Sequence, residues 1–376
     1  MCGISGIIRY NSKASLEEIS AMNEIIKHRG PDGEGVYIKD NIALGHRRLS
    51  IIDLEGGKQP MNYENENLII TYNGEIYNYK ELKSELINKG YNFKTESDTE
   101  VILASYSEWK EKCLNKLRGM FAFCIVDYSS EKLLIARDPV GIKPLVFWRH
   151  NDFFAFASEL PALRAVKNAI PKGNLNAIEE FLRLSYIPAP NTIYKGIFKL
   201  LPGHYMNISF DGEISTEINY WDFNFNNSNI TNKNWIEETS KYINESVKSH
   251  LVSDVPFGVF LSGGIDSTIV AGTMSKILDQ KIKAFTIGFK DKKYDELKYA
   301  EKAAKRYGLE LISKIIDVNE ISIIEDLIKH HGEPFGDSSI IPTWNVCKLA
   351  REHVPMVLSG DGGDELFGGY NRHRII

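Results

Sequence analysis

The chain has few cysteines, no long apolar run and no large excess of one charge. Its 376 residues include 45 basic and 50 acidic side chains, which give a formal net charge of −5. The four cysteines (Cys2, Cys113, Cys124 and Cys347) have no metal-binding spacing, which argues against a disulfide scaffold and for a reducing compartment. Without a basic excess, a signal peptide or an apolar run of membrane-spanning length, we expect a cytoplasmic protein that binds neither nucleic acid nor membrane.

The length and the order of apolar segments indicate two domains. In the first half, short apolar segments alternate with glycine-rich turns, and three helical patterns interrupt them. The expected strands are Gly3–Arg9, Ile42–Leu44, Leu68–Tyr72, Phe121–Asp127, Lys132–Arg137 and Phe153–Ala157. The expected helices are Leu16–His28, with Ser15 and Glu18 as a capping box, Asn78–Lys89 and Thr99–Trp109. This order predicts an α+β sandwich.

The second residue is the first candidate for chemistry. Cys2 is small enough for the initiator methionine to be removed, which would place a thiol and a free α-amine on one residue. An α-amine has an ordinary pKa of about 8, so part of it is neutral at pH 7 and can accept the thiol proton. The alternative is an ordinary second residue whose thiol has no role.

Four polar clusters follow the expected strands, and each has a structural alternative. Pro31-Asp32-Gly33 is turn chemistry, Asn73-Gly74 is a hairpin signal, and Ser97 or Asp98 could cap the following helix. Taken in order with the N-terminus, however, the motifs resemble the glutaminase domain of glutamine-hydrolysing asparagine synthetases. These motifs are Met-Cys-Gly-Ile-Ser-Gly, Arg-Gly-Pro-Asp, Arg-Leu-Ser-Ile-Ile-Asp, Tyr-Asn-Gly-Glu-Ile-Tyr-Asn and Ser-Asp-Thr-Glu.

The resemblance implies a class II amidotransferase with an N-terminal-nucleophile hydrolase fold. It implies that Cys2 attacks the glutamine amide, while Asn73 and the Gly74 N–H stabilise the oxyanion. The other implied glutamine-binding residues are Arg48 for the α-carboxylate, Glu75 and Asp98 for the α-ammonium, and main-chain groups near Ile51 and Ile52, together with Asn73. The neighbouring Arg47 is the less favoured carboxylate ligand.

From Trp235 onward, strands and helices alternate, which predicts a doubly wound parallel sheet. The expected strands are Gly258–Leu261, Ala284–Phe289, Glu310–Asp317 and Met356–Leu358, and the expected helices are Trp235–His250, Ser267–Leu278, Tyr294–Tyr307 and two more before the last strand. Ligands bind at the carboxyl ends of such strands. The domains are expected at 2–205 and 235–376, with an asparagine-rich linker within 206–234.

The loop Ser262-Gly263-Gly264-Ile265-Asp266-Ser267 follows a strand and opens a helix, so its amides can cradle a pyrophosphate. A tight turn is the alternative. The loop resembles the signature of ATP pyrophosphatases, and Ser359-Gly360-Asp361 resembles the family's second nucleotide loop. The resemblance implies ATP binding by Leu261, Ser262, Gly263, Gly264, Asp266, Ser267, Ile287, Ser359 and Gly360, and Mg²⁺ binding by Asp266 and Asp364. Asp361 replaces a glutamate found in some family members, and Glu333–Ser339 is expected to border the cleft.

The whole pattern implies an asparagine synthetase that uses glutamine, aspartate and ATP with Mg²⁺ and releases AMP and pyrophosphate, possibly as a homodimer. Family members usually continue with a further helical region, so the synthetase domain is expected to be incomplete at the C-terminus. Three alternatives stay open. They are a related amidotransferase acting on another carboxylate, such as a sugar acid or a β-lactam precursor, a glutaminase only, and a non-catalytic nucleotide-binding protein.

Overall fold

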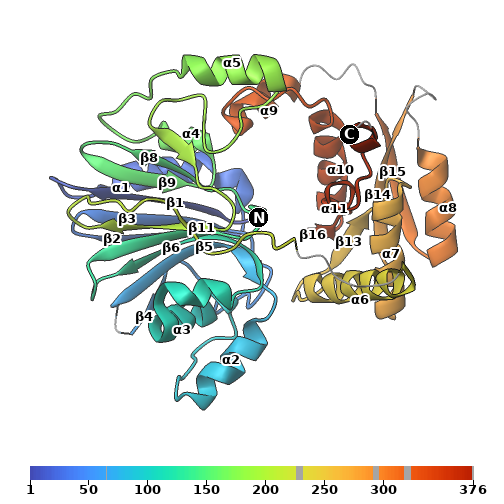
Figure 1. Cartoon of the computed structure of the whole chain (residues 1–376), viewed down its shortest axis with the longest axis horizontal. Coiled ribbons are helices and arrows are strands. Elements are labelled where there is room, and N and C mark those ends of the chain that lie inside the picture. Colours follow the sequence, from blue (N-terminus) through green and yellow to red (C-terminus); the bar gives the residue numbers. More distant parts are fainter. Residues whose placement is uncertain (65, 226–231, 291–295, 317–322, 375–376) are drawn as a thin grey trace. The chain divides into compact units, whose positions relative to one another are not determined.

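A computed structural model describes residues 1–376 apart from 65, 226–231, 291–295, 317–322 and 375–376. The chain forms two compact units (Figure 1). The first unit contains Met1–Phe225 and Glu325–Gly336, and the second contains Asn226–Ile324 and Asp337–Ile376. The segment Glu325–Gly336 therefore belongs to the first unit although the chain on both sides of it belongs to the second.

The first unit is built on two six-stranded antiparallel sheets, stacked as layers in Figure 1. The first sheet has the order β10-β8-β9-β1-β3-β2 and the second has the order β12-β11-β7-β6-β5-β4. The strands are β1 Gly3–Arg9, β2 Gly33–Lys39, β3 Ile42–Arg48, β4 Met61–Tyr63, β5 Leu68–Ile76, β6 Gly119–Asp127, β7 Lys132–Arg137, β8 Val146–Arg149, β9 Phe153–Ala157, β10 Ile197–Lys199, β11 His204–Ser209 and β12 Ile218–Asn219.

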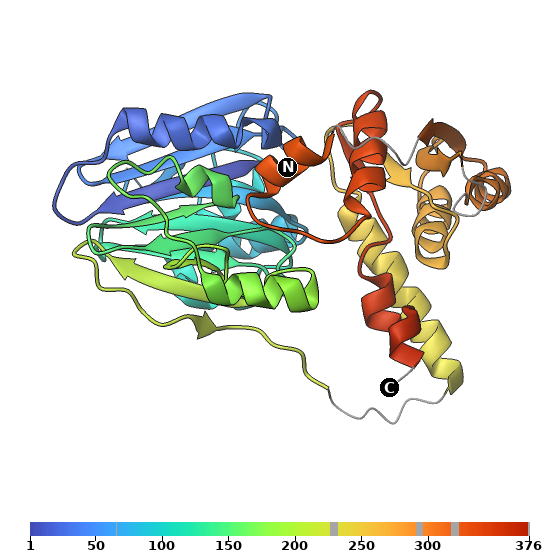
Figure 2. The same cartoon turned by 90° about the horizontal axis from the view of Figure 1, so that it is seen from above.

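Helices cover the outer faces of both sheets, which gives the predicted sandwich. The helices are α1 Leu16–Ile25, α2 Tyr79–Asn88, α3 Asp98–Trp109, α4 Leu160–Leu163 and α5 Leu175–Leu184. Helix α1, dark blue in Figure 2, packs on the first sheet, and α3 packs on β4 and β5 of the second. Buried aliphatic side chains from both sheets, such as Ile8, Leu44, Ile69 and Ile135, fill the space between the layers. Because β1 and β5 both contribute side chains to this core, the core holds these two strands in place.

Several local expectations for the first unit need correction. Ser15 precedes α1 but makes no side-chain capping hydrogen bond, whereas Ser97 accepts one from the Thr99 N–H at the start of α3. Asn73-Gly74 is not a hairpin turn, because both residues lie inside β5 and pair with β6. The linker was expected over 206–234, but β11 and β12 occupy 204–219 and extend the second sheet beside β7.

The second unit contains the predicted parallel sheet, with the order β15-β14-β13-β16. Its elements are α6 Asn232–His250, β13 Phe257–Phe260, α7 Ile265–Ile277, β14 Lys283–Phe289, α8 Leu297–Tyr307, β15 Glu310–Ile316, α10 Ile340–Arg351, β16 Met356–Leu358 and α11 Gly363–Phe367; α9 Ile324–His331 leads into the segment that joins the first unit. Helices α7 and α8 pack on one face of the sheet and α10 packs on the other. The strand order reverses between β13 and β16, which is where doubly wound sheets bind ligands.

Hydropathy along the helices gives one further result. Within the described ranges, none of the helices combines the length and the apolar character needed to cross a bilayer.

Candidate active sites

Cys2 lies directly before β1 and is held by groups from two other segments. Its Sγ lies 3.5 Å from the Leu49 carbonyl oxygen, and the Leu49 N–H donates to Sγ at 3.4 Å. Arg29 Nε donates to the Cys2 carbonyl oxygen at 2.9 Å, so the backbone of the nucleophile is fixed as well. Burial raises the pKa of the thiol, and the Leu49 backbone and the Arg48 and Arg29 charges oppose part of that effect. The thiol therefore needs a base to become the reactive thiolate.

Two polar atoms on β5 are buried without a partner among the residues that the structure describes. They are Asn73 Nδ2, on a side chain that is 1% exposed, and Glu75 Oε1, on one that is 5% exposed. Residues two apart on a strand point to the same face, so the donor and the acceptor lie side by side. A buried polar atom without a partner is costly, and a bound ligand that accepts from Asn73 and donates to Glu75 would remove both costs.

Asp98, the first residue of α3, is a buried carboxylate with strong donors. The Tyr72 hydroxyl donates to Asp98 Oδ2 at 2.8 Å, and the Ile76 N–H donates to the same oxygen at 3.0 Å. Burial raises the pKa of Asp98, while these two donors and the Thr99 amide lower it. The sequence motifs contain both Asp98 and Tyr72, but the sequence assigned a role only to Asp98.

Glu75 and Lys143 are two further buried ionisable groups near the nucleophile, and each acts on the pKa of the other. Burial and the Asp98 charge raise the pKa of Glu75 to about 8, and Lys143 opposes this shift. Burial and the Arg29 charge lower the pKa of Lys143 to about 8, against the charges of Glu75, Asp138 and Cys2. Lys143 is 4% exposed, and its Nζ lies 3.2 Å from Met1 Sδ. The sequence analysis assigned no role to Lys143 and missed this ammonium.

The two neighbouring arginines at the end of β3 have different surroundings. Arg47 forms ion pairs with Glu24 at 2.6 Å and Glu34 at 2.9 Å, so it is engaged on the α1 side of the sheet. The Arg48 guanidinium instead donates to three carbonyls of the loop after β3, those of Ile52, Asp53 and Leu54. These bonds use three of its five N–H donors and orient it beside Cys2, on whose pKa its charge acts. Ile52 therefore contacts the arginine through its main-chain carbonyl, whereas Ile51 is not among these three acceptors.

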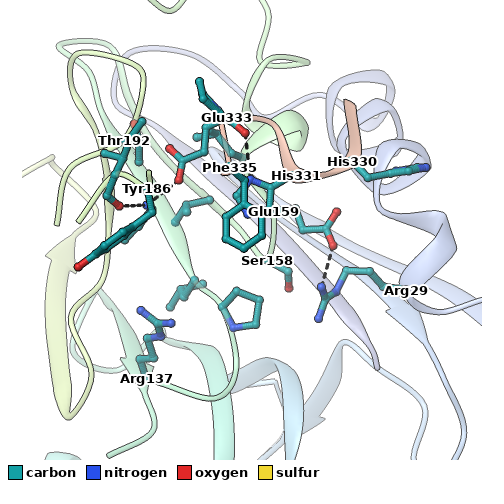
Figure 3. Close-up of a pocket in the computed structure, with 17 residues that line it drawn as sticks. Arg29, Arg137, Ser158, Glu159, Tyr186, Thr192, His330, His331, Glu333 and Phe335 are labelled. Atoms are coloured by element: carbon teal, nitrogen blue, oxygen red, sulfur yellow. Dashed lines mark hydrogen bonds and ion pairs between the residues drawn. The ribbon is translucent and has the colours of Figure 1, made fainter. Parts of the chain in front are cut away.

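A cavity of about 380 Å³ lies within the first unit (Figure 3). On one side, Arg29 Nη1 pairs with Glu159 Oε1 at 2.7 Å, and on the other the buried Glu333 points toward Thr192. The Glu333 carboxylate accepts from Lys199 Nζ at 2.6 Å and from the Ile193 N–H at 3.2 Å. These contacts attach the segment Glu325–Gly336 to the first unit, so Glu333 has a defined place there rather than in an open loop.

In the second unit, the loop from Ser262 to Ser267 joins β13 to α7. The Ser262 and Ser267 hydroxyls lie 3.0 Å apart, the Gly264 N–H donates to Ser262 Oγ at 3.2 Å, and the Ser267 hydroxyl donates to the Gly264 carbonyl at 3.3 Å. Gly263 has a φ of +85°, and a Cβ there would lie 2.6 Å from the Ala300 nitrogen. Only glycine fits this turn, which opens a helix N-terminus of the kind that binds phosphate.

The second loop, after β16, packs directly on the start of α7. A Cβ on Gly360 would lie 2.7 Å from the Ser267 nitrogen, and one on Gly363 would lie 2.5 Å from Asp266 Cγ. Burial and the charges of Asp364 and Glu365 raise the pKa of Asp266, so these carboxylates lie close together. Ser359 Oγ donates to Asp361 Oδ2 at 2.8 Å.

Most of the nucleotide-binding residues expected in the second unit thus gather at the β13–β16 edge. Leu261 follows β13 and donates its N–H to Phe285, and Ile287 lies on β14 near its carboxyl end. Among the described residues no cluster of three metal-ligating side chains was found. Asp266 and Asp364 nevertheless suit Mg²⁺, which binds through one or two carboxylates together with the phosphates of its substrate.

These two sites define the class of protein. A cysteine placed at the start of a strand in a two-layer antiparallel sandwich is typical of N-terminal-nucleophile amidotransferases, and the second unit is a parallel sheet with a glycine-rich loop between its strand β13 and helix α7. Residues 1–221 match the glutamine amidotransferase domain family, and residues 238–376 match the asparagine synthase family.

Curated relatives lead to the particular family. The chain is 41% identical to glutamine-hydrolysing asparagine synthetase 1 of Bacillus subtilis, over 100% of this chain and 60% of that protein. It is 41% identical to a putative glutamine-hydrolysing asparagine synthetase of Methanocaldococcus jannaschii, over 99% of this chain and 76% of that protein. The identity to asparagine synthetase B of Escherichia coli is 33%, over 98% and 65%. The chain belongs to the family of glutamine-hydrolysing asparagine synthetases, and it spans about 60% of the length of the Bacillus relative.

Proposed function

We propose that the chain takes part in glutamine-dependent asparagine synthesis and that the first unit hydrolyses glutamine at Cys2. After removal of Met1, the Cys2 α-amine accepts the thiol proton and the thiolate attacks the side-chain amide carbon. The carbon–nitrogen bond breaks, the same proton goes to the leaving nitrogen, and ammonia departs from a γ-glutamyl thioester. Water then hydrolyses the thioester to glutamate and restores the thiol.

The observation that carries this proposal is the pair of unpartnered buried atoms on β5. Asn73 Nδ2 is a donor suited to the oxyanion of the tetrahedral intermediate, together with the Gly74 N–H. Glu75 Oε1 is an acceptor suited to the α-ammonium of glutamine, and Asp98 is the second carboxylate for that group. Arg48 retains N–H donors for the α-carboxylate.

For the second unit we propose ATP binding and adenylation of the aspartate β-carboxylate. Ser262, Gly263, Gly264 and Ser267 would bind the pyrophosphate part of ATP at the start of α7. Asp266 and Asp364 would hold Mg²⁺, which would neutralise phosphate charge when bound. The aspartate carboxylate attacks the α-phosphorus and pyrophosphate leaves. Ammonia then attacks the acyl adenylate, and asparagine and AMP are released.

The experiment compares the wild type with Cys2→Ala, and with the exposed Cys347→Ala as the matched control. Glutamate, AMP and asparagine are measured with Mg-ATP and aspartate, supplied with either glutamine or ammonium chloride. We expect Cys2→Ala to lose glutamate release and to keep ammonia-dependent AMP formation, and Cys347→Ala to behave as the wild type. Glutamate release at the wild-type rate by Cys2→Ala would contradict the first half. ADP and phosphate in place of AMP and pyrophosphate would contradict the second.

A further inference from the structure

Tyr72 on β5 contacts Asp98 at the start of α3. Its side chain is 2% exposed, and its hydroxyl is 2.8 Å from Asp98 Oδ2. The Ile76 N–H meets the same oxygen at 3.0 Å from the other end of the motif. Two donors that converge on Oδ2 from different residues of β5 hold the carboxylate in one orientation.

We propose that Tyr72 is a positioning residue for glutamine recognition, because its hydroxyl orients Asp98 and keeps it ionised for the α-ammonium. The inference rests on the proposed glutaminase function and adds a residue that the sequence motifs did not assign. Burial favours the protonated form of Asp98, and a protonated carboxyl binds an ammonium weakly. A hydrogen bond donated to the ionised form acts in the opposite direction.

The charges around this pair explain why a neutral donor is needed. Asp98 faces Tyr72 from β5 and the amides at the start of its own helix, and its charge raises the pKa of Glu75 on β5. Tyr72 in turn faces Asp98, Glu75 and Cys2, and Lys143 lies near Glu75. An arginine or lysine in place of Tyr72 would also hold Asp98 ionised, but its charge would repel the incoming ammonium. The tyrosine hydroxyl stabilises the carboxylate without that repulsion.

The test is Tyr72→Phe, which removes the hydroxyl and keeps the ring. We expect the KM for glutamine to rise about tenfold with a small change in kcat, as for loss of a hydrogen bond to a charged group. We expect the acidic limb of the kcat/KM profile to move to higher pH by about one unit, because the Asp98 pKa rises. The matched control is Tyr106→Phe, which removes another buried tyrosine hydroxyl that donates to an aspartate, Asp127 Oδ2 at 3.2 Å. Its KM and its acidic limb should match the wild type.

A second substrate separates positioning from general damage. Glutaramate, which is glutamine without its α-ammonium, gives Asp98 nothing to bind, so Tyr72→Phe and the wild type should hydrolyse it equally well. An equal loss on both substrates would assign Tyr72 a structural role and overturn the proposal.

A second variant covers the case in which Tyr72→Phe does not fold. Site-specific 3-fluorotyrosine at position 72 keeps the size of the ring and strengthens the donor, so it should move the acidic limb to lower pH. An unmoved limb contradicts the proposal. If the wild type releases glutamate and Tyr72→Phe matches it on glutamine at every pH, only the role of Tyr72 is wrong. If the wild type releases no glutamate, the proposed function and this inference both fall.

Discussion

Glu75 should make the ligand-free protein less stable as the pH rises, and Glu75→Gln should remove that effect. The carboxyl is 5% exposed, and burial together with Asp98 raises its pKa from 4.5 to about 8. Since the folded-state pKa is the higher one, the stability it contributes is fully present below about pH 4.5. That stability is lost progressively as the pH rises toward 8. At pH 7 the loss is about 3 kcal/mol, because each unit between the unfolded pKa and the pH corresponds to about 1.4 kcal/mol.

The assay is urea unfolding at pH 5.5 and pH 7.5, followed by tryptophan fluorescence in a Cys2→Ala background so that added glutamine persists. Without glutamine, raising the pH from 5.5 to 7.5 should lower the free energy of unfolding of the parent by about 2–3 kcal/mol more than that of Glu75→Gln. With glutamine, the parent should be stabilised and Glu75→Gln much less so, because the amide cannot pair with the α-ammonium. The exposed Glu55→Gln serves as the control. If Glu75→Gln keeps the pH dependence of its parent, the buried carboxyl is not its source.

Three other changes test separate parts of the chain. Asn73→Ala should lower the rate of glutamate release about 10²–10³-fold with little change in KM, because one oxyanion donor is lost; steady-state kinetics checks this. Gly263→Ala should abolish ATP binding in calorimetry and leave glutamate release intact, because the added Cβ has no room at a φ of +85°. Lys199→Met should leave the buried Glu333 carboxylate without its cation, and amide exchange at Ile193 should become at least tenfold faster; unchanged exchange would show that the ion pair does not hold the segment.

The sequence predicted the strands of the second unit well. The strands of the second unit are apolar runs bounded by turn residues, and their expected bounds agree with β13–β16 to within about one residue. The strands that were missed are short or carry polar residues on an exposed face, such as β2, β4 and β12. Tertiary pairing with neighbouring strands, which local composition does not report, makes these segments extended.

The candidate sites divide along a similar line. Residues inside ordered motifs, such as Cys2 and Asp98, could be named from the sequence because the motifs resemble a known family. No role could be assigned to Tyr72, although it begins one of these motifs, or to Lys143, because a tyrosine in a strand and a lysine after a turn are ordinary residues until the fold places them near buried carboxylates. For the Asn73-Gly74 pair, the structural alternative of a hairpin turn was wrong, because both residues pair with β6 inside a strand.

The segment Glu325–Gly336 has a consequence for dividing the protein into parts. A cut after Phe225 would separate the chain at a single point but would not release a complete first unit, because one wall of its cavity is encoded about a hundred residues later. An isolated 1–225 fragment would expose the Lys199 ammonium and the Ile193 amide that Glu333 satisfies in the whole chain. If the part after Phe225 were replaced by that of a relative, the relative's counterpart of Glu325–Gly336 would have to pack against the first unit of this chain. The first unit is therefore encoded by two separate stretches of the gene.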